Sequence, residues 1–228
     1  MTSPIKVISS MATRQILAEL VARYQQDSGQ PVATEAVGGV DAARRVRSGE
    51  AFDVVVLAAN AIDELIQAGR IVGGRVDLVR SGVAIAVRAG SPKVDIGSEE
   101  AVKRAVANAR SVSYSTGPSG VHLAGLFERW GILDAIKARI VQAPPGVPVG
   151  SLVAEGQVEL GFQQLSELIH LPGIEVLGPL PPDIQTITTF SAGVAGTSTQ
   201  PDAARALIDF LASPAAAGPK RANGMEPA

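Results

Sequence analysis

The chain has 228 residues, of which 46% are hydrophobic and only 4% aromatic, a composition typical of aliphatic strands packed between alanine-rich helices. Its net charge of −2 and its scattered basic residues exclude an extended surface for nucleic acid or for an anionic membrane. It contains no cysteine and only two histidines, far apart in sequence, which excludes disulfides, thiolate metal sites and a histidine-based metal motif.

Three strand–turn–helix units are predicted in the first part of the chain. The strands cover residues 6–9, 31–37 and 52–58, and the helices cover residues 14–28, 41–47 and 62–68. Strands that alternate with helices form a parallel sheet with right-handed crossovers, and ligands bind at the carboxyl ends of its strands. We therefore expect the turns at 9–13, 38–41 and 58–61 to share one edge of the sheet.

A second α/β lobe is predicted after residue 81. Its strands are expected at 82–87, 111–114, 140–142, 158–162 and 174–177, and its helices at 98–108, 121–130 and 151–155. Residues 186–195 are rich in β-formers and return the chain to the first lobe, where a last helix covers 202–211. The predicted fold is thus two doubly wound α/β lobes joined by a two-strand hinge, with lobe I at 1–81 and 193–228 and lobe II at 82–192.

The turn from Tyr114 to Gly120 carries the first functional hypothesis. It joins a strand to an amphipathic helix through small, hydroxyl-bearing and glycine residues. The first N–H groups of a helix have no partner within it, and together with the helix dipole they can hold an anion. The alternative is ordinary helix capping by serine and threonine.

The start of the chain bears on where the protein works. Met1-Thr2-Ser3-Pro4 leads directly into the first strand, and no apolar run reaches the length of a membrane span. The sequence predicts a cytoplasmic protein if Met1 is native, and a periplasmic one if a signal peptide was removed.

Six short motifs in a fixed order resemble the type II periplasmic-binding-protein fold, and within it the molybdate-binding (ModA-like) solute-binding proteins. They are Val7–Ser10, Gly38–Arg44 with Gly49, Phe52–Ala58, Ser115–Gly120, Gly156–Gly161, and Ala204–Pro214 followed by Gly224–Pro227. The resemblance implies two lobes that close over an oxyanion held by N–H groups of helix-opening turns and a few hydroxyls. Pro118-Ser119-Gly120 matches one such turn and Val147-Pro148-Val149 a second, although Pro148 has no N–H to give.

The chain departs from the molybdate binders at the positions that supply side-chain hydroxyls. Met11 and Val40 stand where those proteins usually have serines, with Ser9, Ser10 and Gly39 alongside, and Gln163 stands at the usual tyrosine. A tetrahedral oxyanion would lose most of its hydroxyl donors here. We therefore expect a small organic carboxylate rather than molybdate.

Several side chains could replace the missing donors. Arg80 could clamp a carboxylate by two hydrogen bonds, and the Gln163 amide could bind ligand oxygens, although a solvated arginine and a capping role are the alternatives. The predicted ligand-binding residues are Ser9, Ser10, Met11, Gly38, Gly39, Val40, Arg80, Ser115, Thr116, Pro118, Ser119, Gly120, Val147 and Gln163. Asp53 should lie at the opposite end of its strand, as a turn or cap residue.

Two functions follow from these residues. The first is a binding protein for a small anion, which would serve an ABC permease only if exported. The second is an enzyme on the same scaffold, because aconitate isomerases are similar to ModA-like proteins and catalyse an allylic proton shift in a tricarboxylate. In that case Arg80 and the turns at 38–41 and 115–120 would hold carboxylates, and His122 or Glu35 would move the proton. No metal cluster or nucleotide fingerprint is present in the sequence, so no cofactor is expected.

Overall fold

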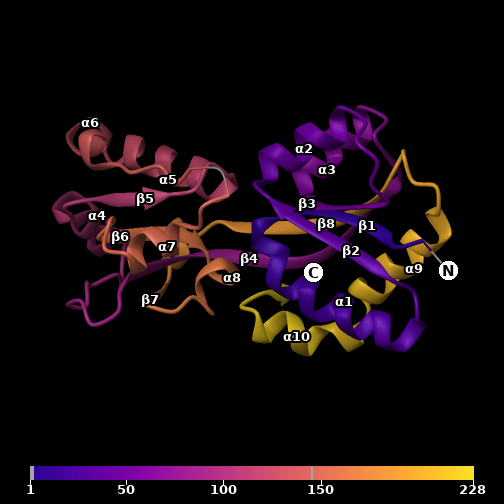
Figure 1. Ribbon diagram of the computed structural model, residues 1–228. Coiled ribbons are helices and arrows are strands. Elements are labelled where there is room, and N and C mark those ends of the chain that lie inside the picture. The colour runs from indigo at the N-terminus through magenta and orange to yellow at the C-terminus, as the bar shows by residue number, and fades with distance from the viewer. Residues whose placement is uncertain (1–2, 145) are drawn as a thin grey trace. The chain divides into compact units, whose positions relative to one another are not determined.

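The computed structural model describes residues 3–144 and 146–228 (Figure 1). The chain forms two compact units: unit 1 comprises the residues up to Ser81 together with Thr188–Ala228, and unit 2 comprises Gly82–Ile187. The chain leaves unit 1 within β4 (Ile71–Arg88) and returns at the start of β8 (Ile187–Ala195). The predicted α/β class is confirmed; the return to unit 1, predicted at 193, lies at 188 in this division.

Unit 1 is built on a sheet in which β1 (Ile5–Ser10) lies between β2 (Val32–Val37) and β3 (Val54–Ala58), and both neighbours run parallel to it. β8 pairs antiparallel with β3, and β9 (Glu226–Pro227) pairs antiparallel with the first part of β4. The helices of unit 1 are α1 (Arg14–Ser28), α2 (Gly39–Arg47), α3 (Ala59–Gln67), α9 (Pro201–Ala212) and α10 (Ala217–Ala222), with short 3-10 turns at Met11–Thr13 and Pro214–Ala216.

The fully buried strand β3 explains why this sheet is covered on both faces. Val54 and Val56 pack in one apolar cluster with residues of α1 and α9, whereas Val55 and Leu57 pack in another with residues of α2 and α3. Successive side chains of a strand point to opposite faces, so an unbroken aliphatic run needs a helical layer on each side. Figure 1 shows α2 and α3 on one side of β3, and α1 and α9 on the other.

Unit 2 repeats this plan around β6 (Leu160–Gln164), which runs parallel to β5 (Val112–Tyr114) and antiparallel to the second part of β4. β7 (Ile174–Pro179) pairs antiparallel with the other side of β4. The helices are α4 (Glu99–Asn108), α5 (Pro118–Arg129), α6 (Leu133–Ile136), α7 (Val149–Ala154) and α8 (Leu165–Leu168), with 3-10 turns at Lys137–Arg139 and Pro182–Ile184. Phe127 of α5 packs edge-on against Phe162 of β6 in the larger core of this unit.

Two predicted strands differ in the structure. Residues 140–142 do not form a strand, because only Ile140 makes a single bridge to Val112. Conversely, β4 begins at Ile71, where the sequence analysis placed no strand, since Arg75, Asp77 and Arg80 interrupt any apolar pattern. These charged residues are tolerated because this part of β4 is largely exposed between its buried ends.

Candidate functional site

The carboxyl ends of β1, β2 and β3 lie on one edge of the unit 1 sheet, as predicted. Ser10 pairs with Val37 of β2, and Ser9 pairs with Val56 of β3. The turns after these strands open the 3-10 turn before α1, helix α2 and helix α3, respectively. We call this the carboxyl edge of unit 1.

The carboxyl edge of unit 1 offers backbone donors at the start of α2. The helix begins at Gly39, earlier than predicted, so the N–H groups of Gly39, Val40 and Asp41 have no partner within it. The N-cap residue Gly38 contributes no side chain, and the Val40 side chain is 69% exposed. The aligned dipoles of α2 add a partial positive charge at this point.

Ser10 brings a hydroxyl to the same place. Its side chain is buried, and within the part of the chain that the structure describes its Oγ has no hydrogen-bond partner. A Cβ added at Gly39 would lie only 3.7 Å from the Cβ of Ser10, so the hydroxyl lies beside the start of α2. Ser9 is different, because its Oγ donates to the carbonyl of Glu35 at 3.5 Å. Met11, which stands at a usual serine position, is the first residue of the following 3-10 turn.

In unit 2, the predicted anion turn follows β5 as expected, but most of its donors are already used. Gly117 N–H donates to Ser115 Oγ at 3.4 Å, and Gly120 N–H donates to the Gly117 carbonyl at 3.0 Å. Pro118 is the first helical residue and has no N–H. The Gly120 N–H is therefore already occupied, and the ligand-binding role of the Pro118–Gly120 turn stays a prediction. Ser119 N–H is left in the first turn of α5.

Two serine hydroxyls lie at the start of α5. Ser115 Oγ and Ser119 Oγ lie 3.2 Å apart and share a hydrogen bond. Ser119 is buried, whereas Thr116 is exposed at the tip of the turn. Unit 2 thus presents mainly hydroxyl donors at this turn.

The second turn expected to bind an anion is also occupied. Val147 N–H donates to the Pro144 carbonyl at 3.0 Å, which argues against its use as a donor to ligand, and its ligand-binding role stays a prediction. Pro145, in the same turn, lies outside the described residues. At the start of α7, Gly150 N–H donates to the side-chain oxygen of Gln163 at 3.4 Å. The side-chain amide oxygen of Gln163 therefore occupies the Gly150 N–H group in the first turn of α7.

Gln163 makes a second contact that the sequence analysis missed. It is 2% exposed, and its Nε2 donates to Glu167 Oε1 at 2.7 Å. Because the two hydrogen bonds of Gln163 fix which end of the amide faces which partner, the glutamate is held beside the end of β6. The spacing of Gln163 and Glu167 at i and i+4 across the strand-to-helix junction was the signal that could have indicated this pair.

Arg80 lies in β4 beside the C-terminal strand. Its register partner is Glu226, and its Nη2 donates to the Pro227 carbonyl at 3.0 Å. The side chain is exposed, in keeping with the alternative of a solvated surface arginine. The clamp on a ligand carboxylate stays a prediction.

Glu35 is engaged by an arginine. Arg45 donates to both of its carboxylate oxygens, at 2.6 and 2.9 Å, and also to Glu50 at 2.5 and 2.8 Å. The hydrogen bonds from Arg45 hold the pKa of Glu35 below its ordinary value. A carboxylate held in this way is a weak proton acceptor, which argues against the predicted catalytic role of Glu35.

His122 is the fifth residue of α5 and is half-buried. Its Nε2 lies 2.8 Å from the carbonyl oxygen of Ile184, which can only accept, so Nε2 carries a proton. This bond ties α5 to the 3-10 turn at Pro182–Ile184. A role of His122 in proton transfer stays a prediction.

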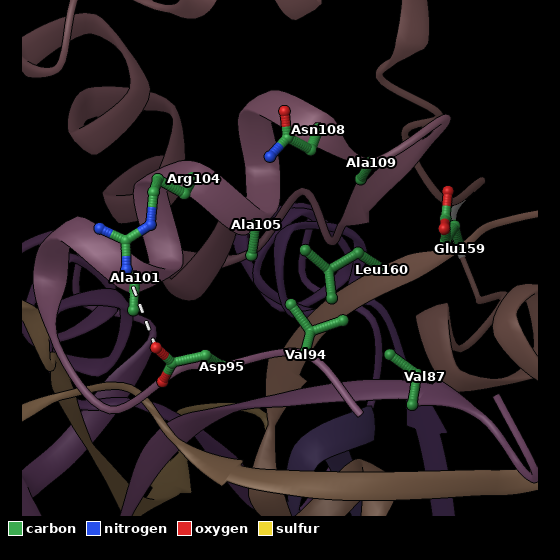
Figure 2. A pocket seen from close by; sticks show the side chains of 10 residues that line it. All are labelled: Val87, Val94, Asp95, Ala101, Arg104, Ala105, Asn108, Ala109, Glu159 and Leu160. Atoms are coloured by element: carbon green, nitrogen blue, oxygen red, sulfur yellow. Dashed lines mark ion pairs between the residues drawn. The ribbon is translucent and has the colours of Figure 1, made fainter. Parts of the chain in front are cut away.

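A pocket of about 260 Å³ lies elsewhere in unit 2, between α4 and the sheet (Figure 2). Val87 and Leu160 belong to its apolar wall, and the weak ion pair of Asp95 with Arg104, at 3.8 Å, closes one side. Leu160 begins β6, so the pocket lies at the amino ends of β5 and β6, opposite the turn that opens α5. None of the predicted site residues lines it.

Among the residues that the structure describes, no helix is long and apolar enough to cross a membrane. In residues 3–144 and 146–228, no three side chains of the metal-binding types gather closely enough to hold an ion.

Comparison with known proteins identifies the family. A family model described as bacterial extracellular solute-binding protein matches residues 5–226. The chain is 38% identical over 232 residues to an aconitate isomerase of Pseudomonas sp., covering 98% of this chain and 87% of that protein. It is 24% identical to the molybdate-binding protein ModA of Azotobacter vinelandii, covering 91% of this chain and 84% of that protein.

A solved structure agrees with the sequence matches. The periplasmic molybdate-binding protein of Azotobacter vinelandii superposes with a TM-score of 0.82 at 20% identity, covering 97% of this chain and 98% of that one. The ModA-like scaffold predicted from the six motifs is thus confirmed. The chain belongs to the bacterial extracellular solute-binding protein family.

Proposed function

We propose that this protein binds a small organic di- or tricarboxylate. The observation that carries the proposal is the buried hydroxyl of Ser10, without a partner among the described residues, beside the unpaired N–H groups that open α2. A buried polar group without a partner is costly, and an incoming carboxylate oxygen would satisfy it. The hydrogen bond would be charge-assisted and would gain from the dipole of α2.

The donors in unit 2 favour a carboxylate over a tetrahedral metal oxyanion. Two N–H groups in the turns expected to contact an oxyanion, those of Gly120 and Val147, already donate within the protein, as does the N–H of the neighbouring Gly150. What remains at the turn before α5 is a pair of serine hydroxyls and one N–H group. A polycarboxylate spreads its charge over several groups and can use these separate donors, whereas molybdate needs a dense ring of them.

The ligand class is tested by thermal melting. We expect the melting temperature to rise with cis-aconitate, trans-aconitate or citrate and to stay unchanged with molybdate at the same concentration. A ligand at 100 times its Kd adds about 2.7 kcal/mol to the free energy of unfolding, which such a scan detects readily. Stabilisation by molybdate alone would refute the carboxylate proposal.

Replacing Ser10 tests the site itself. Ser10→Ala removes a hydroxyl that has no partner in the described chain, so the unliganded protein should melt at or slightly above the wild-type temperature. The same change removes a hydrogen bond to a charged ligand, worth about 1.5–3 kcal/mol, and should raise the Kd for the carboxylate roughly 10- to 100-fold by calorimetry.

Ser48→Ala, at the other end of α2, is the matched control and should leave the Kd unchanged; its hydroxyl bonds to the Arg45 carbonyl. If Ser10→Ala destabilises the unliganded protein and leaves ligand affinity unchanged, Ser10 belongs to the core and not to the site.

Isomerisation of aconitate is a second candidate function, favoured by the 38% identity to an aconitate isomerase over nearly the whole chain. The reaction is an allylic proton shift that needs bound carboxylates and one acid–base group. Proton NMR of cis-aconitate incubated with the protein should show conversion to the trans isomer. A periplasmic form would in addition deliver its ligand to an ABC permease, whereas a cytoplasmic form would act on the ligand directly.

A further inference from the structure

Of the two acid–base residues suggested by the sequence, the structure argues against Glu35 and ties His122 to the 3-10 turn at Pro182–Ile184. Glu35 accepts two hydrogen bonds from Arg45, and His122 holds its Nε2 proton against the carbonyl of Ile184. A proton shift needs a carboxylate or imidazole held in a fixed position near the ligand donors. We therefore also consider the other titratable residues at the ends of the strands that carry those donors.

Glu167 lies at such a strand end in unit 2. β5 and β6 run parallel, and Tyr114 pairs with Phe162 in register. β5 ends at Tyr114 and β6 runs on to Gln164, so Ser115 and Gln163 both lie at the carboxyl edge of this sheet. Glu167 belongs to α8, which starts directly after β6, and its Oε1 accepts a hydrogen bond from Gln163 Nε2 at 2.7 Å. The glutamate thus shares this edge with the Ser115–Ser119 hydroxyl pair.

The position of Glu167 is fixed from two sides. Gln163 is 2% exposed, and its side-chain oxygen is held by Gly150 N–H at the start of α7. α8 itself packs on the sheet through Leu168, which is fully buried. The Gln163 amide that donates to Glu167 is neutral, whereas the guanidinium that binds both oxygens of Glu35 is positively charged. Glu167 itself remains half-exposed at the surface of unit 2.

We propose that Glu167 is the acid–base residue of an allylic isomerisation of aconitate, and that Gln163 is its positioning residue; this rests on the proposed isomerase function. Glu167 as carboxylate takes one proton from the methylene carbon of cis-aconitate. The electron pair of that C–H bond spreads over the three-carbon allyl unit and its carboxylates. Glu167, now the acid, returns the proton to the carbon that was the vinylic CH. The double bond moves by one carbon, and neither atoms nor charge are gained or lost.

The test compares Glu167→Gln with the wild-type protein in two assays. The glutamine keeps an oxygen that can accept from Gln163 but cannot take a proton. We expect kcat for cis-to-trans conversion, followed by proton NMR, to fall at least 100-fold, as is usual for loss of a general base. The rise in melting temperature with cis-aconitate should stay close to that of the wild type. Glu128→Gln, on the exposed side of α5, is the matched control and should leave both readouts unchanged.

Two further variants distinguish the loss of a base from a folding defect in Glu167→Gln. Glu167→Asp keeps the acid but withdraws it by one methylene group, and should lower kcat roughly 10- to 100-fold with ligand binding retained. Gln163→Leu should lower kcat, and shift the pH profile of kcat because the hydrogen bond to the carboxylate is lost, with little change in KM.

Failure of the Glu167 proposal and failure of the isomerase function give different results. If Glu167→Gln keeps kcat within threefold of the wild type, or raises KM with kcat unchanged, Glu167 is not the base although the isomerase function stands. If the wild-type protein binds cis-aconitate and converts none of it, the isomerisation and the role of Glu167 both fall, and the binding proposal survives.

Discussion

Gly120→Ala should destabilise the protein by about 2–4 kcal/mol, because a Cβ at this position would meet backbone. The added atom would lie 1.6 Å from the carbonyl oxygen of Ser115 and 2.8 Å from its carbon. No side-chain rotation relieves an overlap with a main-chain carbonyl, so the turn between β5 and α5 must move. Helix propensity alone would favour alanine here by roughly 0.5–1 kcal/mol, so the sign of the effect tests the packing.

Movement of the turn between β5 and α5 should also displace the serine hydroxyls that we propose as ligand donors. The hydroxyl of Ser115 bonds to that of Ser119, and Gly117 N–H bonds to Ser115 Oγ, so a displaced Ser115 disrupts the whole turn. We expect Gly120→Ala to weaken carboxylate binding at least tenfold by calorimetry at a temperature where the variant is folded.

A glycine in the same helix provides the control. Nothing lies within 4 Å of a Cβ at Gly125, which is exposed, so Gly125→Ala should be neutral or stabilising by roughly 0.5–1 kcal/mol. Urea unfolding followed by circular dichroism measures both variants. Equal stability of Gly120→Ala and Gly125→Ala would show that the close approach of Ser115 to α5 does not exist in solution.

Sequence reasoning located the sheet edges well because they depend on local patterns. The strand–turn–helix order around Ser10, Gly38 and Ala58 requires parallel strands, and parallel strands end on one edge. The packing of β3 between two helical layers likewise follows from its unbroken aliphatic run. These features are set by the order of residues along the chain, and the structure confirms them.

Which donors remain available could not be predicted in the same way. The N–H groups of Gly120, Val147 and Gly150 are each taken by an acceptor whose placement depends on the folded geometry. In the case of Gly150, the acceptor is a side chain on another strand, Gln163. The pairing of Glu35 with Arg45 similarly depends on how β2 faces α2. The first part of β4 was missed because its exposed charged residues hide the alternating apolar pattern of a strand.

The position of Asp53 could be predicted from the local sequence, whereas its hydrogen-bond partners could not. The sequence predicted a turn or cap residue at the end of β3 opposite the carboxyl edge, and Asp53 does precede that strand. Its partners could not be predicted from the sequence, because two of them, Ser198 and Gln200, lie between β8 and α9. Asp53 is 5% exposed and accepts hydrogen bonds from Lys6 N–H at 2.8 Å, from Ser198 Oγ at 2.7 Å and from Gln200 Nε2 at 3.1 Å.

Replacing Asp53 with asparagine should cost about 2–4 kcal/mol of unfolding free energy at pH 7. A carboxylate only accepts hydrogen bonds, and all three of its partners here donate. The asparagine amide would direct its NH₂ group at one of them and leave a buried donor unsatisfied. Urea unfolding of Asp53→Asn measures the loss. Asp27→Asn, an exposed position near the end of α1, changes the net charge equally and should be neutral.

The effect of Asp53 should also depend on pH. Burial by itself would raise the pKa of Asp53, but the hydrogen bonds from Lys6, Ser198 and Gln200 outweigh it and lower the pKa below the ordinary value of 3.8. The carboxylate therefore contributes stability above the unfolded pKa, and this contribution is lost as the pH falls through the lower folded value. The difference in unfolding free energy between wild type and Asp53→Asn should be constant from pH 7 to about pH 5 and shrink below about pH 4. A difference that stays constant down to pH 3, or that grows on acidification, would mean that the ionised form of Asp53 is not what the three donors stabilise.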